Sequence, residues 1–76
     1  MRHYQVQVSI GTKSPQTFTS ISGPSTKAGH ERAKETAIGV AECRVEENIY
    51  SRVIVMEYDI VGKVVGDGPV WDSEDK

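Results

Sequence analysis

The segment that decides the fold is residues 49–58, Ile49-Tyr50-Ser51-Arg52-Val53-Ile54-Val55-Met56-Glu57-Tyr58. β-branched and aromatic residues dominate it, which is typical of a strand. Alternate side chains of a strand point to opposite faces, so Val53 and Val55 fall on one face and Ile54 and Met56 on the other. Both faces are therefore apolar in the middle of the segment, which is the strongest strand signal in the chain.

A first strand is expected at residues 4–10, Tyr4-Gln5-Val6-Gln7-Val8-Ser9-Ile10, whose apolar and polar residues alternate strictly. This pattern predicts a strand with one buried and one solvated face. Residues 11–15 are turn formers, and residues 16–22 are rich in Thr and Ser with Phe18 and Ile21, which predicts a second strand in a hairpin. Phe18 and Ile21 share a face only if that strand contains a bulge.

A helix is expected from Thr26 to about Arg44, because Ala, Lys and Glu replace the strand-forming residues there. Ser25 is the expected N-cap. Small residues recur at helical spacing, which predicts a narrow apolar stripe that packs closely on a sheet. These residues are Gly29, Ala33, Ala37, Val40 and Ala41.

After residues 49–58, the segment 59–65 is expected to form a turn and a fourth strand, and Val70-Trp71 a short edge. The order is then β-β-α-β-β. We expect one α+β domain over residues 1–71, with a three- to four-stranded antiparallel sheet packed on one helix. Residues 72–76 are expected to be an acidic flexible tail.

The composition excludes several classes of protein. A chain of 76 residues has no room for a second domain, and its single cysteine excludes an internal disulfide. One Cys and two His fall short of the four ligands of a structural zinc site. The chain shows neither a secretory leader pattern nor an apolar run long enough to span a membrane, so we expect a cytoplasmic protein with no membrane partner.

Charge is divided unevenly along the chain, although the net charge is only −2. Residues 1–41 contain five Lys or Arg and two Glu, whereas residues 42–76 contain four Lys or Arg and nine Asp or Glu. The chain lacks a basic stripe that would neutralise phosphates, so a nucleic-acid partner is not expected.

Known catalytic patterns are not found, and we expect no enzyme, no cofactor and no bound metal. Gly62-Lys63 is followed by Val64, so it does not complete a phosphate-binding loop. Cys43 is expected to be a small packed residue of the helix. No sequence spacing ties it to His3 or His30 as a catalytic base.

One helix covers one face of a sheet, and the other face of an antiparallel sheet is normally polar. Residues 53–56 depart from that rule, so either the sheet curls to bury both faces or the uncovered face meets another molecule. The candidate partner-binding residues are the sheet residues Tyr50, Arg52, Val53, Val55 and Tyr58 with an acidic rim of Glu46, Glu47, Glu57 and Asp59. Tyr50, Arg52 and Tyr58 on one strand would also suit base stacking on a single-stranded nucleic acid.

The layout resembles that of small β-β-α-β-β proteins from phage and prophage accessory regions, which include anti-CRISPR inhibitors. The similar segments are Tyr4-Gln5-Val6-Gln7-Val8, Thr17-Phe18-Thr19, Ala33-Lys34-Glu35-Thr36-Ala37, the Val/Ile strand and the end near Trp71. The resemblance implies a non-catalytic inhibitor that occludes a surface of a host nucleoprotein complex. The expected function is therefore protein binding. The alternatives are a homodimer that associates through its sheet and a single-stranded nucleic-acid-binding domain.

Overall fold

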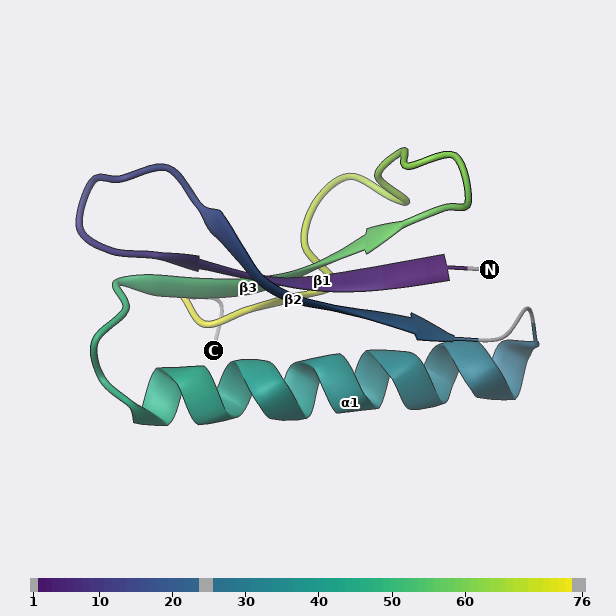
Figure 1. Ribbon diagram of the computed structural model, residues 1–76, viewed down its shortest axis with the longest axis horizontal. Coiled ribbons are helices and arrows are strands. Elements are labelled where there is room, and N and C mark those ends of the chain that lie inside the picture. The colour runs from purple at the N-terminus through teal and green to yellow at the C-terminus, as the bar shows by residue number, and fades with distance from the viewer. Residues whose placement is uncertain (1, 24–25, 75–76) are drawn as a thin grey trace.

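Helix α1 lies along one face of a four-stranded antiparallel sheet in this computed structural model, which describes residues 2–23 and 26–74 (Figure 1). The strand order across the sheet is β2-β1-β3-β4, so the N-terminal strand is central. The predicted α+β class and β-β-α-β-β order are confirmed. The elements are β1 (Arg2–Ser9), β2 (Gln16–Gly23), α1 (Lys27–Glu46), β3 (Arg52–Tyr58) and β4 (Trp71–Asp72).

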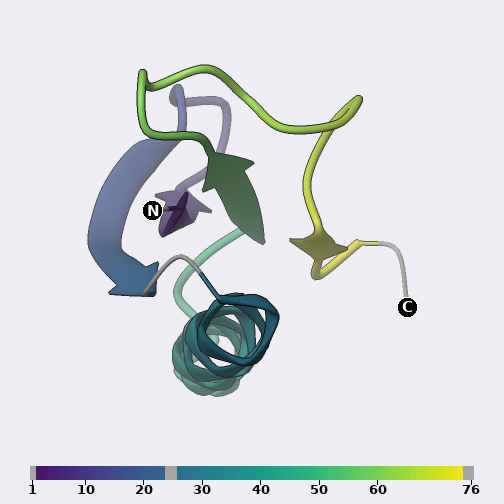
Figure 2. The ribbon, with the colours of Figure 1, turned by 90° about the vertical axis from the view of Figure 1, so that its right-hand side faces the viewer.

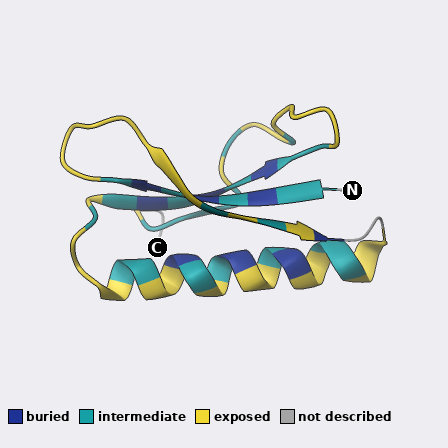
Figure 3. Cartoon of the chain, in the orientation of Figure 1, coloured by how far each residue is buried: buried dark blue, intermediate teal, exposed yellow. Residues whose placement is uncertain are grey.

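The core lies between α1 and the faces of β1 and β3 that carry valine (Figure 3). Val6 lies directly opposite Val55, and Val8 lies opposite Val53. Val6, Val53 and Val55 are at most 1% exposed, and they pack against alanines of α1. Alanine has no side chain beyond Cβ, so the helix approaches the sheet closely. The buried alanines are Ala33, Ala37 and Ala41.

The opposite face of β3 carries Ile54 and Met56, which are half-buried. Gln7 lies directly opposite Ile54, and Gln5 lies opposite Met56, so neighbouring side chains of β1 stand beside these two apolar residues. Of the two explanations for residues 53–56, the structure therefore assigns Val53 and Val55 to the core. Of these four residues, only Ile54 and Met56 lie on the uncovered face.

Strand β2 contains the bulge that its sequence requires. The register with β1 shifts between Val6 and Gln7, so that Val6 pairs with Thr19 and Gln7 with Thr17. Phe18 is the extra residue, and the bulge lets Phe18 and Ile21 both reach the helix side of the strand. Ile21 packs against the core, and the Phe18 ring lies under Arg44 of α1.

The helix begins at Lys27, one residue later than predicted, and its N-cap is correspondingly one residue later. Thr26 is the N-cap, and its hydroxyl accepts a hydrogen bond of 3.0 Å from the Gly29 amide. Ser25, the predicted cap, lies outside the described residues. The helix ends at Glu46, and Asn48 follows it with a φ of 58°, a left-handed conformation that Asn adopts readily.

The segment after β3 differs from the prediction. Residues 59–65 form turns with one isolated bridge from Val64 to Tyr58, because the Asp59 carboxylate accepts hydrogen bonds from the Val61 and Lys63 amides and holds a tight loop. The fourth strand is Trp71–Asp72, which overlaps the short edge predicted at Val70-Trp71. The predicted tail therefore begins too early, since Ser73 also donates its amide to the Val53 carbonyl.

Gly23 marks the closest approach of the sheet to the helix. A Cβ at this position would lie 2.6 Å from the Gly29 carbonyl oxygen and 2.9 Å from Ala33 Cβ. We expect Gly23→Ala to lower the free energy of unfolding by about 1–3 kcal/mol, because backbone would have to move. Urea denaturation followed by circular dichroism measures this change.

Gly39→Ala is the matched control. A Cβ at Gly39 meets nothing within 4 Å, and the residue is exposed to solvent in the middle part of α1. Alanine there should raise the free energy of unfolding by about 0.5–1 kcal/mol. Equal effects of the two substitutions would contradict the packing described for Gly23.

Candidate protein-binding surfaces

The predicted partner-binding residues do not form one surface. Val53 and Val55 are buried under α1, so their assignment to the sheet surface is wrong. Glu57 is 8% exposed and forms an ion pair with Arg2, so it is not part of an acidic rim. Glu57 was misassigned to the rim because its side chain points to the same face of β3 as those of Val53 and Val55, which is the buried face. Of its other members, Glu46 and Glu47 are exposed at the end of α1, and Asp59 holds the loop after β3.

The uncovered face of the sheet is held by hydrogen bonds among its own side chains. Gln7 Nε2 donates to Tyr58 Oη at 3.0 Å and to Gln5 Oε1 at 3.2 Å. Thr17 Oγ1 donates to the same Gln5 oxygen at 3.4 Å. These bonds run from β2 through β1 to β3. Tyr58, a predicted contact residue, is therefore engaged within the sheet.

Arg52, on the same face, fastens β4 to β3. Its guanidinium donates two hydrogen bonds to the Asp72 carboxylate. The Glu74 carboxylate oxygen Oε2 lies 3.9 Å from Arg52 Nε. Val53 adds a backbone connection, because its amide donates to Ser73 Oγ and its carbonyl accepts from the Ser73 amide. The hydrogen bond from Arg52 holds the pKa of the Asp72 carboxyl below its usual range. The short strand thus closes one edge of the sheet.

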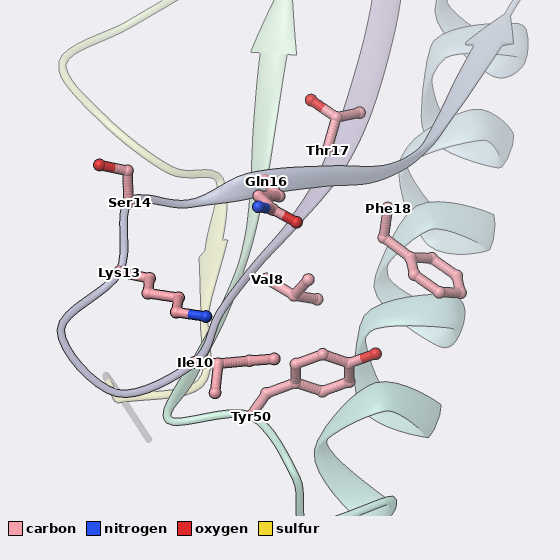
Figure 4. A pocket seen from close by; sticks show the side chains of 8 residues that line it. All are labelled: Val8, Ile10, Lys13, Ser14, Gln16, Thr17, Phe18 and Tyr50. Atoms are coloured by element: carbon pink, nitrogen blue, oxygen red, sulfur yellow. The ribbon is translucent and has the colours of Figure 1, made fainter.

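Tyr50 belongs to a different surface from Arg52 and Tyr58. Its ring lies on the helix side, beside Val8, Ile10 and Phe18, around a cavity of about 330 Å³ (Figure 4). Lys13 and Ser14 of the loop between β1 and β2 complete the wall with Gln16 and Thr17. The three residues expected to stack bases therefore do not face one another. The cavity is near the lower limit for small-molecule sites, roughly 300 Å³.

The outer edge of β2 is open. The N–H and C=O of Val53 bond to Ser73, on the side of β3 that faces away from β1. In an antiparallel sheet, successive residues direct these groups alternately to the two sides of the strand. Followed through the registers of β3, β1 and β2, this alternation directs the N–H and C=O of Ser20 and Ser22 away from β1. Among the described residues, no strand pairs with this side of β2. Seen end-on, β2 forms the margin of the sheet above α1 (Figure 2). The eight residues of β2 include no charged side chain and no proline.

Two features of α1 accompany this edge. A second cavity, of about 210 Å³, lies between β2 and α1, and its lining includes Ile21, Gly23, Gly29 and Thr36 together with Arg32. Further along the helix, the Arg44 guanidinium carbon lies 4.5 Å from the centroid of the Phe18 ring, and Arg44 pairs with Glu47 at 2.6 Å. Both cavities therefore border β2, one near each end of the strand. The sequence pattern gave no sign of them.

The histidines and the cysteine do not form a catalytic group. Cys43 is exposed, which corrects its expected packing, and it lies thirteen residues from His30, about 20 Å along the helix axis. His3 Nδ1 and the Ser22 hydroxyl form a hydrogen bond of 2.6 Å. Within residues 2–23 and 26–74, His, Cys, Asp and Glu side chains nowhere gather in a group of three that could hold a metal ion.

A search for relatives gives no further assignment. No family model, curated protein or solved structure matches this chain. In the described part of the chain, α1 is too polar to cross a membrane. The candidate sites consequently depend on geometry alone.

The Arg52–Asp72 pair predicts a dependence of stability on pH. The pKa of Asp72 is lowered in the folded state, so the pair stabilises the fold above the carboxyl's unfolded pKa, about 3.9, and that contribution disappears as the pH falls through the folded value. Asp72→Asn should therefore lower the melting temperature at pH 7 and have less effect at pH 2. Thermal melts across this range measure it.

Asp67→Asn provides the control with the same change of charge, because Asp67 is exposed in the loop before β4. It should leave the melting temperature nearly unchanged at both pH values. An equal response of the two variants would show that net charge, and not the pair with Arg52, determines the effect.

Proposed function

We propose that this protein is a non-catalytic protein-binding module that accepts an extended segment of a partner along the outer edge of β2. The observation that carries this function is an eight-residue edge strand with outward backbone groups and no charged side chain. Natural edge strands are usually protected by charge, proline or a covering segment. Strand β2 has none of these three within the described residues, and its bulge at Phe18, which is a further form of protection, leaves the part after it regular.

The other edge of the sheet supports the same proposal by contrast. Strand β4 has only two residues, and Arg52, Asp72 and Ser73 fix it against β3. The uncovered face is occupied by bonds of its own side chains, such as Gln7 to Tyr58. Binding on that face would have to break these bonds, whereas binding at β2 adds main-chain hydrogen bonds to groups already directed outward.

The bulge at Phe18 limits the docking segment. A bulge twists the strand locally, so regular pairing is available chiefly over the part after it, Thr19–Gly23. Ser20 and Ser22 offer the outward groups of this part. A partner strand would therefore gain most of its main-chain hydrogen bonds beside these two residues.

Selection of peptides from a random displayed library against the immobilised protein tests the function. Enriched peptides should shift the backbone amide NMR signals of Ser20 and Ser22. Ser20→Pro should abolish binding, because it removes an outward N–H without removing a bond to β1. Ser20→Ala is the matched control, since it keeps that N–H, and should bind as the wild type does.

Circular dichroism should show the same fold for both variants. Failure to enrich any peptide that depends on the Ser20 N–H would refute the proposed function. Enriched peptides that shift only signals of the uncovered face, such as those of Gln7 and Tyr58, would also refute it.

A further inference from the structure

We infer that the preferred occupant of the β2 edge is an extended acidic peptide, whose side chains on the helix side of the sheet include both apolar residues and Asp or Glu. The inference rests on the proposed function and adds the chemistry of the partner. It is carried by three features that lie together along the strand: the open edge, the two cavities beside it, and cationic side chains without a carboxylate partner.

The cavities determine where apolar side chains go. A strand added to β2 would direct every second side chain to the helix side of the sheet. On that side, the larger cavity presents Val8, Ile10, Phe18 and Tyr50 near the beginning of β2 (Figure 4). The smaller cavity presents Ile21 near the end of β2. Apolar side chains of the peptide would bury their surface there, about 1.5–3 kcal/mol for each one fully buried.

The charges determine the rest of the peptide. Lys13 lines the larger cavity and Arg32 lines the smaller one. Among the described residues, no Asp or Glu lines either cavity, and neither Lys13 nor Arg32 forms an ion pair. Carboxylates of a bound peptide would complement both cations, one near each end of β2. A basic peptide would be repelled at both positions.

The same charges disfavour a second copy of this chain at the edge. Two copies paired through β2 about a two-fold axis would place their α1 helices on the same side of the joined sheet. In a pairing centred on residues 19–23, Arg32 of one copy would then approach Arg32 of the other across the interface. The neutral strand itself would tolerate the pairing, so the cations make the difference between a self-complementary edge and one that suits an acidic segment.

Two synthetic peptides of eight residues, the length of β2, test the inference. Both have Thr at every second position, so that the other four side chains share one face. These four are Glu, Val, Val and Glu in the Val/Glu peptide, and Lys, Val, Val and Lys in the Val/Lys peptide. Fluorescence anisotropy at low salt should show binding of the Val/Glu peptide and at least about tenfold weaker binding of the Val/Lys peptide. Added salt should weaken the binding of the Val/Glu peptide.

Arg32→Glu should reduce the affinity for the Val/Glu peptide by at least about tenfold, because it reverses a charge beside the groove. Lys34→Glu is the matched control. It makes the same change of charge two residues away, but Lys34 lines a hollow on the other flank of α1 with Arg2 and Glu57. Its affinity should stay within about twofold of the wild type.

The outcomes separate this inference from the proposed function. If peptides that depend on the Ser20 N–H bind with no preference for Glu over Lys, the acidic partner is refuted and the function stands. If no peptide engages the edge, both are refuted. A mass of twice 8.4 kDa in light scattering that Ser20→Pro returns to the monomer value would overturn the inference in favour of a second copy.

Discussion

The close contact between the alanine stripe of α1 and the valines of β1 and β3 is the constraint on which the rest of the structure depends. Ala37 and Val55 are fully buried, and Gly23 carries β2 within contact distance of the helix backbone. A helix that lies so near the sheet excludes water with few large side chains, which suits a chain of 76 residues. The same arrangement fixes the face of β3 that is buried, and with it the positions of the candidate contact residues on that strand.

Sequence patterns were sufficient for the layout but not for the faces. The strict alternation of residues 4–10 and the change to Ala, Lys and Glu after residue 25 are local signals, and both elements formed there. Residues 53–56 are apolar on both sides, so periodicity alone could not say which side meets the helix. The pairing of Val6 with Val55 decided it, and pairing is a contact between distant segments. Glu57 was misplaced for the same reason.

The C-terminal end shows a second limit of sequence reasoning. Residues 72–74 have the composition of a solvated tail, yet Asp72 and Ser73 hold a strand through Arg52 and the Val53 backbone. These interactions leave no periodic pattern in the sequence, and they join residues twenty positions apart. The cavity beside Phe18 and Tyr50 is unpredictable on the same grounds, because a bulge and a loop create it together. The resemblance to phage accessory proteins stays a prediction.

The uneven charge of the sequence acquires a spatial meaning in the fold. Four carboxylates of the acidic C-terminal half are engaged in internal pairs with arginines, namely those of Glu47, Glu57, Asp72 and Glu74. Lys13 and Arg32, from the basic N-terminal half, remain beside the one long edge that no strand of the described chain covers. Backbone groups directed outward, cavities that include apolar side chains in their lining, and the cations Lys13 and Arg32 thus lie together along β2. In the proposed recognition at this edge, the protein therefore contributes the positive charge and the partner the negative.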